Sequence, residues 1–254
     1  GVIMQIGEEL IKAITPNEIF SFRIFGLRIP VTDTVITTWI VMAVIIILAL
    51  VMTRGLKLIP EGKQNLVEMF VEFVDNTLKD SMGHYSKYFV PYIGTVFLFL
   101  VFANIISIFN IIPSGEDLYE LTHISFFKSF PDFGLRPPTR DLNVTLSLAL
   151  MSVITIAYAG IRFKKLSGWL KTYIEPMPIV LPIKILENFI RMLSLSFRLF
   201  GNVLGAFIIM EIIYVLMPVV LPAGMSIYFD LFDGILQAFI FIFLTNLYIS
   251  EVLE

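Results

Sequence analysis

The sequence predicts an all-α polytopic membrane protein with about five membrane crossings, an amphipathic surface helix and a long tilted helical hairpin at its C-terminal end. Of the 254 residues, 57% are hydrophobic and only 15% are charged, and the mean hydropathy is +0.87. A single soluble core cannot bury so large an apolar fraction. Several apolar runs also reach the length of about 20 residues that a membrane-spanning helix needs.

Composition and motifs argue against several classes of function. The net charge of −3 is too small to indicate a nucleic-acid partner, and the absence of cysteine excludes disulfides and thiolate metal sites. The sequence contains no phosphate-binding loop motif, no Ser/His/Asp arrangement and no cluster of metal ligands. We therefore expect no bound metal or cofactor and no nucleotide catalysis by this chain.

The N-terminal half should contain two spans and a surface helix. Residues 1–34 are predicted to form an outer tail, and they lack the pattern of a cleaved signal. In the region 35–112, the apolar runs at 35–53 and 88–112 are long enough to cross a bilayer. Between them, apolar residues recur at helical intervals opposite charged ones, which predicts an amphipathic helix on the membrane surface. Its apolar positions are Leu66, Met69, Phe70, Phe73, Val74 and Leu78.

The C-terminal half should contain the other three spans. Residues 113–140 mix Pro, Gly and charges and are predicted to form an outer aqueous loop. A third span follows at 141–163, and a helical hairpin at 183–254 has arms at 183–217 and 225–253. Each arm would be roughly 45–50 Å long, against a hydrocarbon core of roughly 30 Å, so we expect the arms to tilt or protrude. We treat residues 1–254 as a single membrane domain.

Basic residues predict the orientation. The 54–87 loop carries five Lys and Arg residues and the 162–171 segment carries four, whereas the N-terminal tail and the 113–140 loop carry three each. Loops rich in Lys and Arg stay in the cytoplasm. With five crossings, the N-terminus should lie outside and the C-terminus should be cytoplasmic.

Polar side chains line one face of each hairpin arm. Counting about 100° per residue, the stripe on the first arm comprises Arg191, Ser194, Arg198, Asn202 and Gly205, with Gly201 beside it. The stripe on the second arm comprises Asp230, Asp233, Gln237, Tyr248 and Glu251. Glu211 lies roughly 140° around the first arm from Arg198. A cation at the centre of a span costs about 2.5–3.5 kcal/mol, so Arg198 indicates a functional site.

Each of these residues also has an interpretation in which it only supports the fold. Arg198 could form a buried ion pair that holds helices together, and Gly201 with Gly205 could serve ordinary helix packing. Gln237 could be an interhelical hydrogen-bond donor. The acidic residues could be solvated near the hairpin turn, as for Asp230 and Asp233, or cap the third span, as for Asp141. Against a purely structural Arg198 stands the small-residue face beside it, which lets another group approach closely.

Three segments together resemble a known family. "DLNVTLSLAL" at 141–150, "SFRLFGN" at 196–202 and "LQAFIF" at 236–241 resemble subunit a of the F-type ATP synthase membrane sector, the stator partner of a rotating c-ring. The likeness covers nearly the whole chain. It implies an ion-translocating subunit, with no cofactor, that carries H⁺ or Na⁺ in a bacterial plasma (inner) membrane. Its implied partners are the c-ring, the peripheral-stalk b subunits, the rest of the ATP synthase and membrane lipid.

The resemblance also implies roles for individual residues. Arg198 matches the family's essential arginine, which faces the ion-binding carboxylate of each passing c subunit between two offset aqueous half-channels. The implied ion path comprises Asn202, Gln237, Asp230, Asp233, Glu211 and Asp141, and the implied rotor-facing packing residues are Ser194, Gly201 and Gly205. Many members carry Glu or His nine residues after the arginine, where this chain has Phe207. We therefore expect the outer half-channel to use Asp230, with Glu211 as a further candidate.

Two other classes of protein would also retain charges in membrane spans. A secondary ion-coupled transporter predicts internal repeats and a substrate pocket at the bilayer midplane, and we find no repeat in the sequence. A purely structural membrane anchor would gain nothing from Arg198, Asp230 and Gln237 on helix faces. Co-purification with a c-ring and a soluble ATPase would separate the three alternatives.

The charge distribution yields a test of topology. Because the chain has no native cysteine, single cysteines can be introduced at Lys63 and Lys165 in the two more basic loops. We expect an impermeant maleimide to label both of them from the cytoplasmic side only. Labelling of Lys165→Cys solely from outside would mean that the orientation is inverted.

Overall fold

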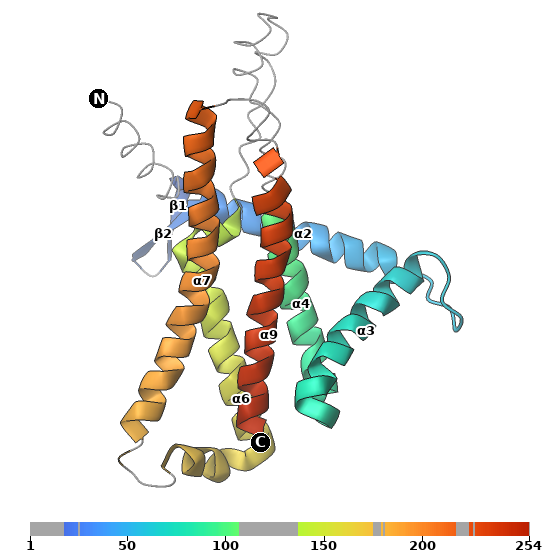
Figure 1. Ribbon diagram of the computed structural model, residues 1–254, viewed down its shortest axis with the longest axis vertical. Coiled ribbons are helices and arrows are strands. Elements are labelled where there is room, and N and C mark those ends of the chain that lie inside the picture. The colour runs from blue at the N-terminus through green and yellow to red at the C-terminus, as the bar shows by residue number, and fades with distance from the viewer. Residues whose placement is uncertain are drawn as a thin grey trace, which may run out of the picture. The chain divides into compact units, whose positions relative to one another are not determined.

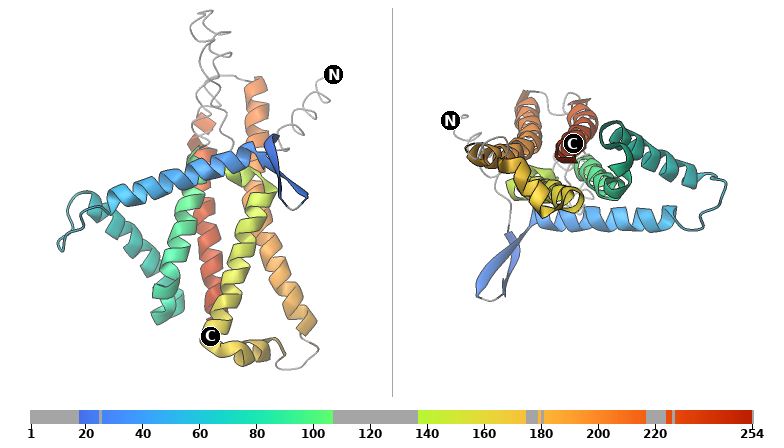
Figure 2. Two further views of the ribbon diagram at one scale, coloured as in Figure 1. Left: turned by 180° about the vertical axis from the view of Figure 1, so that it is seen from behind. Right: turned by 90° about the horizontal axis from the view of Figure 1, so that it is seen from below.

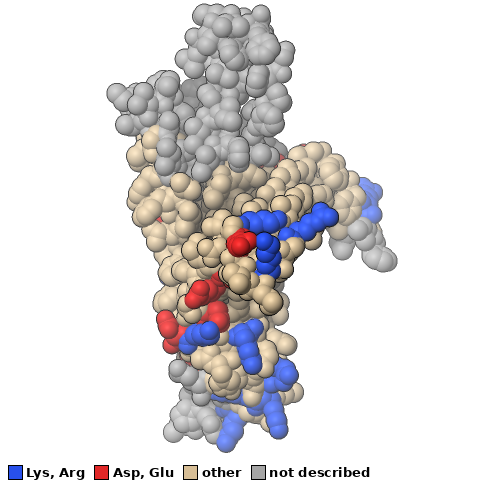
Figure 3. Space-filling model, turned by 90° about the vertical axis from the view of Figure 1, so that its right-hand side faces the viewer, with Lys and Arg blue, Asp and Glu red and all other residues tan. Residues whose placement is uncertain are grey.

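Helices dominate the computed structural model (Figure 1), which describes residues 18–24, 26–106, 137–174, 179, 181–216, 224–225 and 227–253. Within these residues, five helical segments are long and apolar enough to cross a membrane, as the sequence predicted. They are Asp33–Met52, Lys63–Ile105, Leu142–Trp169, Leu181–Met210 and Leu231–Leu253. The coloured surface in Figure 3 is mostly uncharged, as lipid-facing helices require. The all-α polytopic membrane fold is confirmed.

The chain packs into two compact units, each described by itself below. The first unit comprises Gly1–Val44, Leu100–Asp141 and Gly201–Leu236. The second unit comprises Ile45–Phe99, Leu142–Phe200 and Gln237–Glu254.

A β-hairpin precedes the first membrane helix, where the sequence predicted only a tail. Strand β1 (Glu18–Ile24) pairs antiparallel with β2 (Leu27–Thr32). Gly26 has a φ of +83° in the connection, a left-handed conformation that favours glycine. Residues 1–17 of the predicted tail lie outside the described residues.

Helix α2 (Asp33–Met52) follows β2 without a linker and confirms an apolar helix of spanning length where the sequence predicted one at 35–53. Its buried side chains are Thr34, Thr37 and Val41, all in its first half. Most of its apolar side chains are exposed, among them Trp39, Ile46, Ile47 and Leu50. An apolar helix with so little buried surface is suited to a lipid environment.

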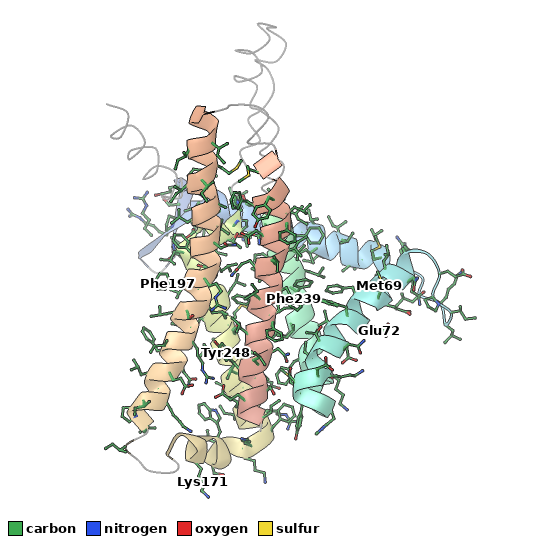
Figure 4. All side chains as sticks on the ribbon, in the orientation of Figure 1. Met69, Glu72, Lys171, Phe197, Phe239 and Tyr248 are labelled. Atoms are coloured by element: carbon green, nitrogen blue, oxygen red, sulfur yellow. The ribbon has the colours of Figure 1, made fainter. Side chains whose placement is uncertain are left out.

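The predicted surface helix is α3 (Lys63–Met82), and a turn of 3-10 helix (Gly83–Tyr85) connects it to α4 (Ser86–Ile105). Phe70 of α3 stacks on Phe97 of α4 with ring centroids 6.1 Å apart, and Ser86 Oγ donates to Asp75 Oδ1 at 2.9 Å. Val74, Leu78 and Met82 are buried, whereas Leu66 and Met69 of the same predicted face are exposed. Figure 4 labels Met69 and Glu72 on this helix. Its location at the membrane surface stays a prediction.

Most of the predicted outer loop at 113–140 lies outside the described residues. Its last part, the 3-10 helix η4 (Pro138–Arg140), is buried and not solvated as an aqueous loop would be. Thr139 Oγ1 donates to the buried Asn104 Oδ1 of α4 at 2.8 Å, and Asn104 Nδ2 donates to Gly234 O at 3.1 Å. These bonds join three segments of the first unit, which explains the burial.

Helix α6 (Leu142–Ile174) carries a sharp break at Lys165, where φ is 61° and ψ is 160°. The break falls just after the predicted end of the third span at 163. The chain returns after it, because Trp169 lies against Gly160: a Cβ on Gly160 would be 2.1 Å from Trp169 Cδ1 and 2.9 Å from Val252 Cγ1. A non-glycine residue with this φ is held there by surrounding packing.

The C-terminal hairpin confirms the two predicted arms in outline. Its first arm is α7 (Leu181–Leu216), which at 36 residues is about 54 Å long. Its second arm begins as a π-helix, η6 (Ile227–Asp233), and continues as α9 (Gly234–Leu253). Residues 217–223 between the arms lie outside the described residues. The tilt of the arms in the bilayer stays a prediction.

Small polar side chains connect the helices of the second unit. Thr145 of α6 and Ser196 of α7 have their hydroxyl oxygens 3.2 Å apart, and so do Ser152 of α6 and Thr245 of α9. Asn246 Nδ2 of α9 donates to a further hydroxyl, Ser81 Oγ of α3, at 3.0 Å. In a bilayer, such hydrogen bonds and close packing hold helices together, because lipid tails are as apolar as the helices themselves.

The contact at Gly160 predicts a stability effect. We expect Gly160→Ala to lower the free energy of unfolding by about 1–3 kcal/mol, because the added methyl group would overlap the rigid indole of Trp169. Gly94→Ala is the matched control, since its nearest side-chain atom, Phe70 Cε1, is at an ordinary 3.7 Å. Equilibrium unfolding in mixed micelles measures both changes. Equal stabilities for the two variants would contradict the described packing of Trp169.

Candidate functional site

A stripe of buried side chains fixes the rotation of α7 about its own axis. Leu195, Ser196 and Leu199 are at most 4% exposed, and Ser196 contacts Thr145 of α6. At about 100° per residue, Phe197 lies on the opposite side, and it is 54% exposed. Figure 4 labels Phe197 on α7. Arg198 therefore lies on the flank of the helix, between its buried and its exposed faces.

Arg198 is exposed, and it forms no hydrogen bond or ion pair with any residue in the described part of the chain. The alternative in which a neighbouring carboxylate of the same chain neutralises it is thus not observed among these residues. Ser194 and Gly201 are also exposed. No atom of the described residues lies within 4 Å of a Cβ placed on Gly201 or on Gly205. The side of α7 that carries these small residues is open to a close approach by another group.

In the first unit, the structure brings together two of the predicted ion-path residues. Asn202 Nδ2 of α7 donates a hydrogen bond to Asp233 Oδ2 at 2.7 Å, and both side chains are half-buried. Asp233 ends the π-helix, a conformation that occurs often at functional sites. The bond holds an acidic side chain next to the amide that follows Arg198 by one helical turn.

A second polar group of the first unit surrounds Asp141. This residue is 7% exposed and accepts a hydrogen bond from Thr34 Oγ1 of α2 at 2.9 Å. The preceding Arg140 is 9% exposed, with its guanidinium carbon 3.5 Å from the ring centroid of Phe207. Phe207 follows Arg198 by nine residues, where the resemblance described above implied Glu or His. Arg140 thus makes a cation–π contact where a carboxylate would give an ion pair.

In the second unit, Arg191 connects α7 to α9. Its Nη2 donates to Glu251 Oε1 of α9 at 2.8 Å and also to Glu187 Oε1 one turn earlier on α7. Its guanidinium carbon lies 4.8 Å from the ring centroid of Tyr248, which Figure 4 labels on α9. One arginine therefore engages two carboxylates and one aromatic face.

The remaining predicted site residues are placed less fully. Gln237 of α9 is 6% exposed, so it lies inside the helix packing of the second unit. Asp230 belongs to the π-helix and Glu211 to α7, but their side chains lie outside the described residues. The structure thus shows hydrogen bonds between Asn202 and Asp233 and between Thr34 and Asp141. It shows no described contact of Arg198 with any of the others.

Sequence reasoning gave no role to the pairing of Arg191 with Glu251 or to the burial of Arg140. Arg191 and Glu251 were both on the polar stripes of their helices, and that shared feature was the available signal. Arg140 was assigned to an aqueous loop by its Pro-rich surroundings. Its place directly before Asp141 at the head of a span was the only cue to burial.

The Arg191 cluster predicts a measurable coupling between α7 and α9. In a double-mutant cycle of Arg191→Leu and Glu251→Gln, we expect a coupling free energy of about 0.5–1 kcal/mol, because Glu251 is largely exposed and water screens the pair. Arg191→Lys should keep most of the stability, since its ammonium can still reach a carboxylate. Equilibrium unfolding in mixed micelles provides the values. Strict additivity of the two single changes would contradict the described bridge.

Comparison with known proteins bears on most of the chain. Residues 35–250 match the family model for the ATP synthase A chain. The chain is also similar to a protein of Propionigenium modestum named ATP synthase subunit a, sodium ion specific. The two are 38% identical over 221 residues, which cover 87% of this chain and 74% of that protein. The matched range 35–250 spans Arg198, Asn202 and Asp233 and all but the last three residues of α9. The chain therefore belongs to the ATP synthase A chain family.

Proposed function

We propose that Arg198 is the fixed charge of a rotary stator, facing the ion-binding carboxylate of each c subunit as the c-ring turns. As an ATP synthase a subunit, the chain is an integral membrane, ion-translocating component and not the nucleotide-hydrolysing one. The observation that carries the proposal is the exposed Arg198 without a described partner, beside two glycines with open space. A cation on an apolar helix costs about 2.5–3.5 kcal/mol unless a counter-charge or water meets it. A ring carboxylate supplies that counter-charge.

The chemistry of arginine suits this role. An arginine side chain carries a permanent positive charge in proteins. It therefore favours the ionised form of a nearby carboxylate. A ring carboxylate reaches this form by releasing its bound ion, and it must do so before it can pass the arginine. The same charge repels cations and prevents direct flow between two half-channels. The membrane potential supplies about 2.3 kcal/mol per elementary charge per 100 mV, which becomes torque only when that direct flow is blocked.

The proposed ion path uses the polar residues around Arg198. The Asn202–Asp233 hydrogen bond supports a path between the middle of α7 and the end of the π-helix. Asp230 would serve the outer half-channel, with Glu211 and Asp141 as further carboxylates, and Gln237 would lie beside the arginine. The transported ion is H⁺ or Na⁺, for which carboxylate and amide oxygens are suitable ligands. Ser194, Gly201 and Gly205 would form the small-residue surface that packs against the rotor.

The proposed assembly follows from membership of the family. The partners of this chain in the assembly would be the c-ring, the peripheral-stalk b subunits and the remaining ATP synthase subunits. The assembly would lie in a bacterial plasma membrane, with the N-terminus of this chain outside and its C-terminus in the cytoplasm. The similar protein is named as sodium ion specific, so the ion needs a direct test. Stimulation of ATP hydrolysis by Na⁺, with protection from a carboxylate-modifying reagent, would identify Na⁺. No effect of Na⁺ on either would identify H⁺.

The Arg198 proposal predicts loss of coupling on substitution. Arg198→Ala should abolish ATP synthesis, because the ring carboxylate loses its cation and the barrier between half-channels falls. Arg198→Lys should also lose synthesis, since a point charge on a flexible stem, with a pKa that falls on desolvation, replaces a planar fork. Arg191→Lys is the matched control and should retain synthesis. The assay is ATP synthesis in proteoliposomes under an imposed ion gradient and potential, with assembly checked by c-ring co-purification. Near-normal synthesis by assembled Arg198→Ala complexes would refute the proposal.

The acidic residues of the π-helix give a second prediction. Asp230→Asn should slow ion-driven ATP synthesis at least tenfold while leaving the complex assembled, because the outer path loses a charge. Asp233→Asn should act in the same direction, and its amide oxygen can still accept the hydrogen bond from Asn202. Rates near that of the unmodified complex for either variant would remove that residue from the path.

A further inference from the structure

The β-hairpin before α2 has two chemically different faces. Phe20 pairs with Val31 and Phe22 with Ile29, which puts these apolar side chains on one face. Ser21 and Arg23 on β1, with Arg28 and Pro30 opposite them, occupy the other face. An irregularity between Glu18 and Phe20 shifts the register by one residue. That shift turns Glu18 onto the polar face, which simple alternation would not do.

The polar face is held together by its own side chains. Arg28 Nη2 donates to Glu18 Oε1 at 2.5 Å, and its Nε donates to Ser21 Oγ at 3.2 Å. The hydrogen bond from Arg28 lowers the pKa of Glu18, so this carboxyl stays ionised near neutral pH. All three side chains are exposed. A face of exposed charged and hydroxyl side chains is suited to contact with water.

The apolar face is largely uncovered. Phe20, Phe22 and Ile29 are 48%, 41% and 39% exposed, and among the described side chains of this face only Val31 is buried. A two-stranded hairpin is marginal at best in water and needs to bury an apolar face for stability. Two exposed aromatic rings and an isoleucine in one row form the surface that has to be covered.

The connection between β2 and α2 keeps the hairpin close to the start of a membrane helix. β2 ends at Thr32 and α2, the most hydrophobic of the described membrane helices, begins at Asp33. Figure 2 shows the hairpin projecting directly from the start of α2. With at most seven residues per strand, the hairpin reaches about 20 Å from this point. It therefore cannot leave the region where α2 meets the lipid headgroups.

We propose that the hairpin is a membrane-interface anchor whose apolar face binds the lipid surface. Phe20, Phe22 and Ile29 insert at the boundary of headgroups and acyl chains, and the face with Arg23 and Arg28 stays in water. Aromatic side chains prefer this depth, and amphipathic elements bind there through buried apolar area. The anchor sets the depth and rotation of α2, because no residue lies between the end of β2 and the start of α2. It depends on the membrane location of the chain and not on the role of Arg198.

Depth measurements on neighbouring residues test this proposal. Single cysteines at Phe22 and Arg23, on opposite faces of β1, are labelled with an environment-sensitive fluorophore in the assembled complex in nanodiscs. The absence of native cysteine in this chain keeps its labelling specific, and the partner subunits are used in cysteine-free form. We expect lipids carrying a nitroxide near the headgroup to quench the Phe22 label at least threefold more than the Arg23 label. Aqueous iodide should show the reverse order.

Two results would overturn the proposal. Equal access of iodide to both labels would mean that the apolar face is solvated. Protection of the Phe22 label from both quenchers would mean that protein, either another subunit or residues 1–17, covers it. Ile29→Cys, the cross-strand neighbour of Phe22, repeats the measurement if Phe22→Cys impairs assembly. Because ATP synthesis by the Arg198 variants does not enter this test, its failure is distinguishable from failure of the proposed function.

Discussion

A permanent positive charge on an apolar membrane helix needs a counter-charge, and no residue in the described part of the chain supplies one to Arg198. The described acidic side chains on the two arms already have partners. Glu187 and Glu251 bind Arg191, and Asp233 accepts from Asn202. Asp141, at the head of α6, likewise accepts a hydrogen bond from Thr34. With these carboxylates engaged, the described chain leaves Arg198 available to a group from another subunit.

The helix packing explains how this exposure is maintained. Ser196 faces Thr145 of α6, and the leucines one position before it and three after it are buried with it. Because the stripe of Leu195, Ser196 and Leu199 faces inward, Arg198 is held on the exposed flank of the helix, about 100° from the centre of the stripe. Other helices of the second unit are connected in the same way, by hydrogen bonds between Ser152 of α6 and Thr245 of α9 and between Asn246 of α9 and Ser81 of α3. Such bonds favour one rotation of each helix over others that bury equal apolar area.

The sequence was sufficient for features that depend on local chemistry. Apolar length predicted the spans, and the helical period predicted the polar stripes of the two arms. It was insufficient where a partner distant in sequence decides the outcome. Burial of Arg140 depends on Phe207, which is far away along the chain, and the Arg191–Glu251 bridge depends on the packing of two helices. The β-hairpin was missed although a local signal was present: residues 20–24 and 27–31 alternate apolar with other side chains around Gly26, as the strands of a hairpin do.

Cross-linking tests the central claim, that the open side of α7 faces the rotor, without relying on catalysis. A cysteine at Gly201, where no described atom lies within 4 Å of the added Cβ, is combined with one next to the ion-binding carboxylate of the c subunit. We expect oxidation to join the two subunits in the assembled complex and to stop rotation. A cysteine at the buried Ser196 should form no such product. Failure of Gly201→Cys to cross-link in an active complex, or equal cross-linking from Ser196→Cys, would contradict the account.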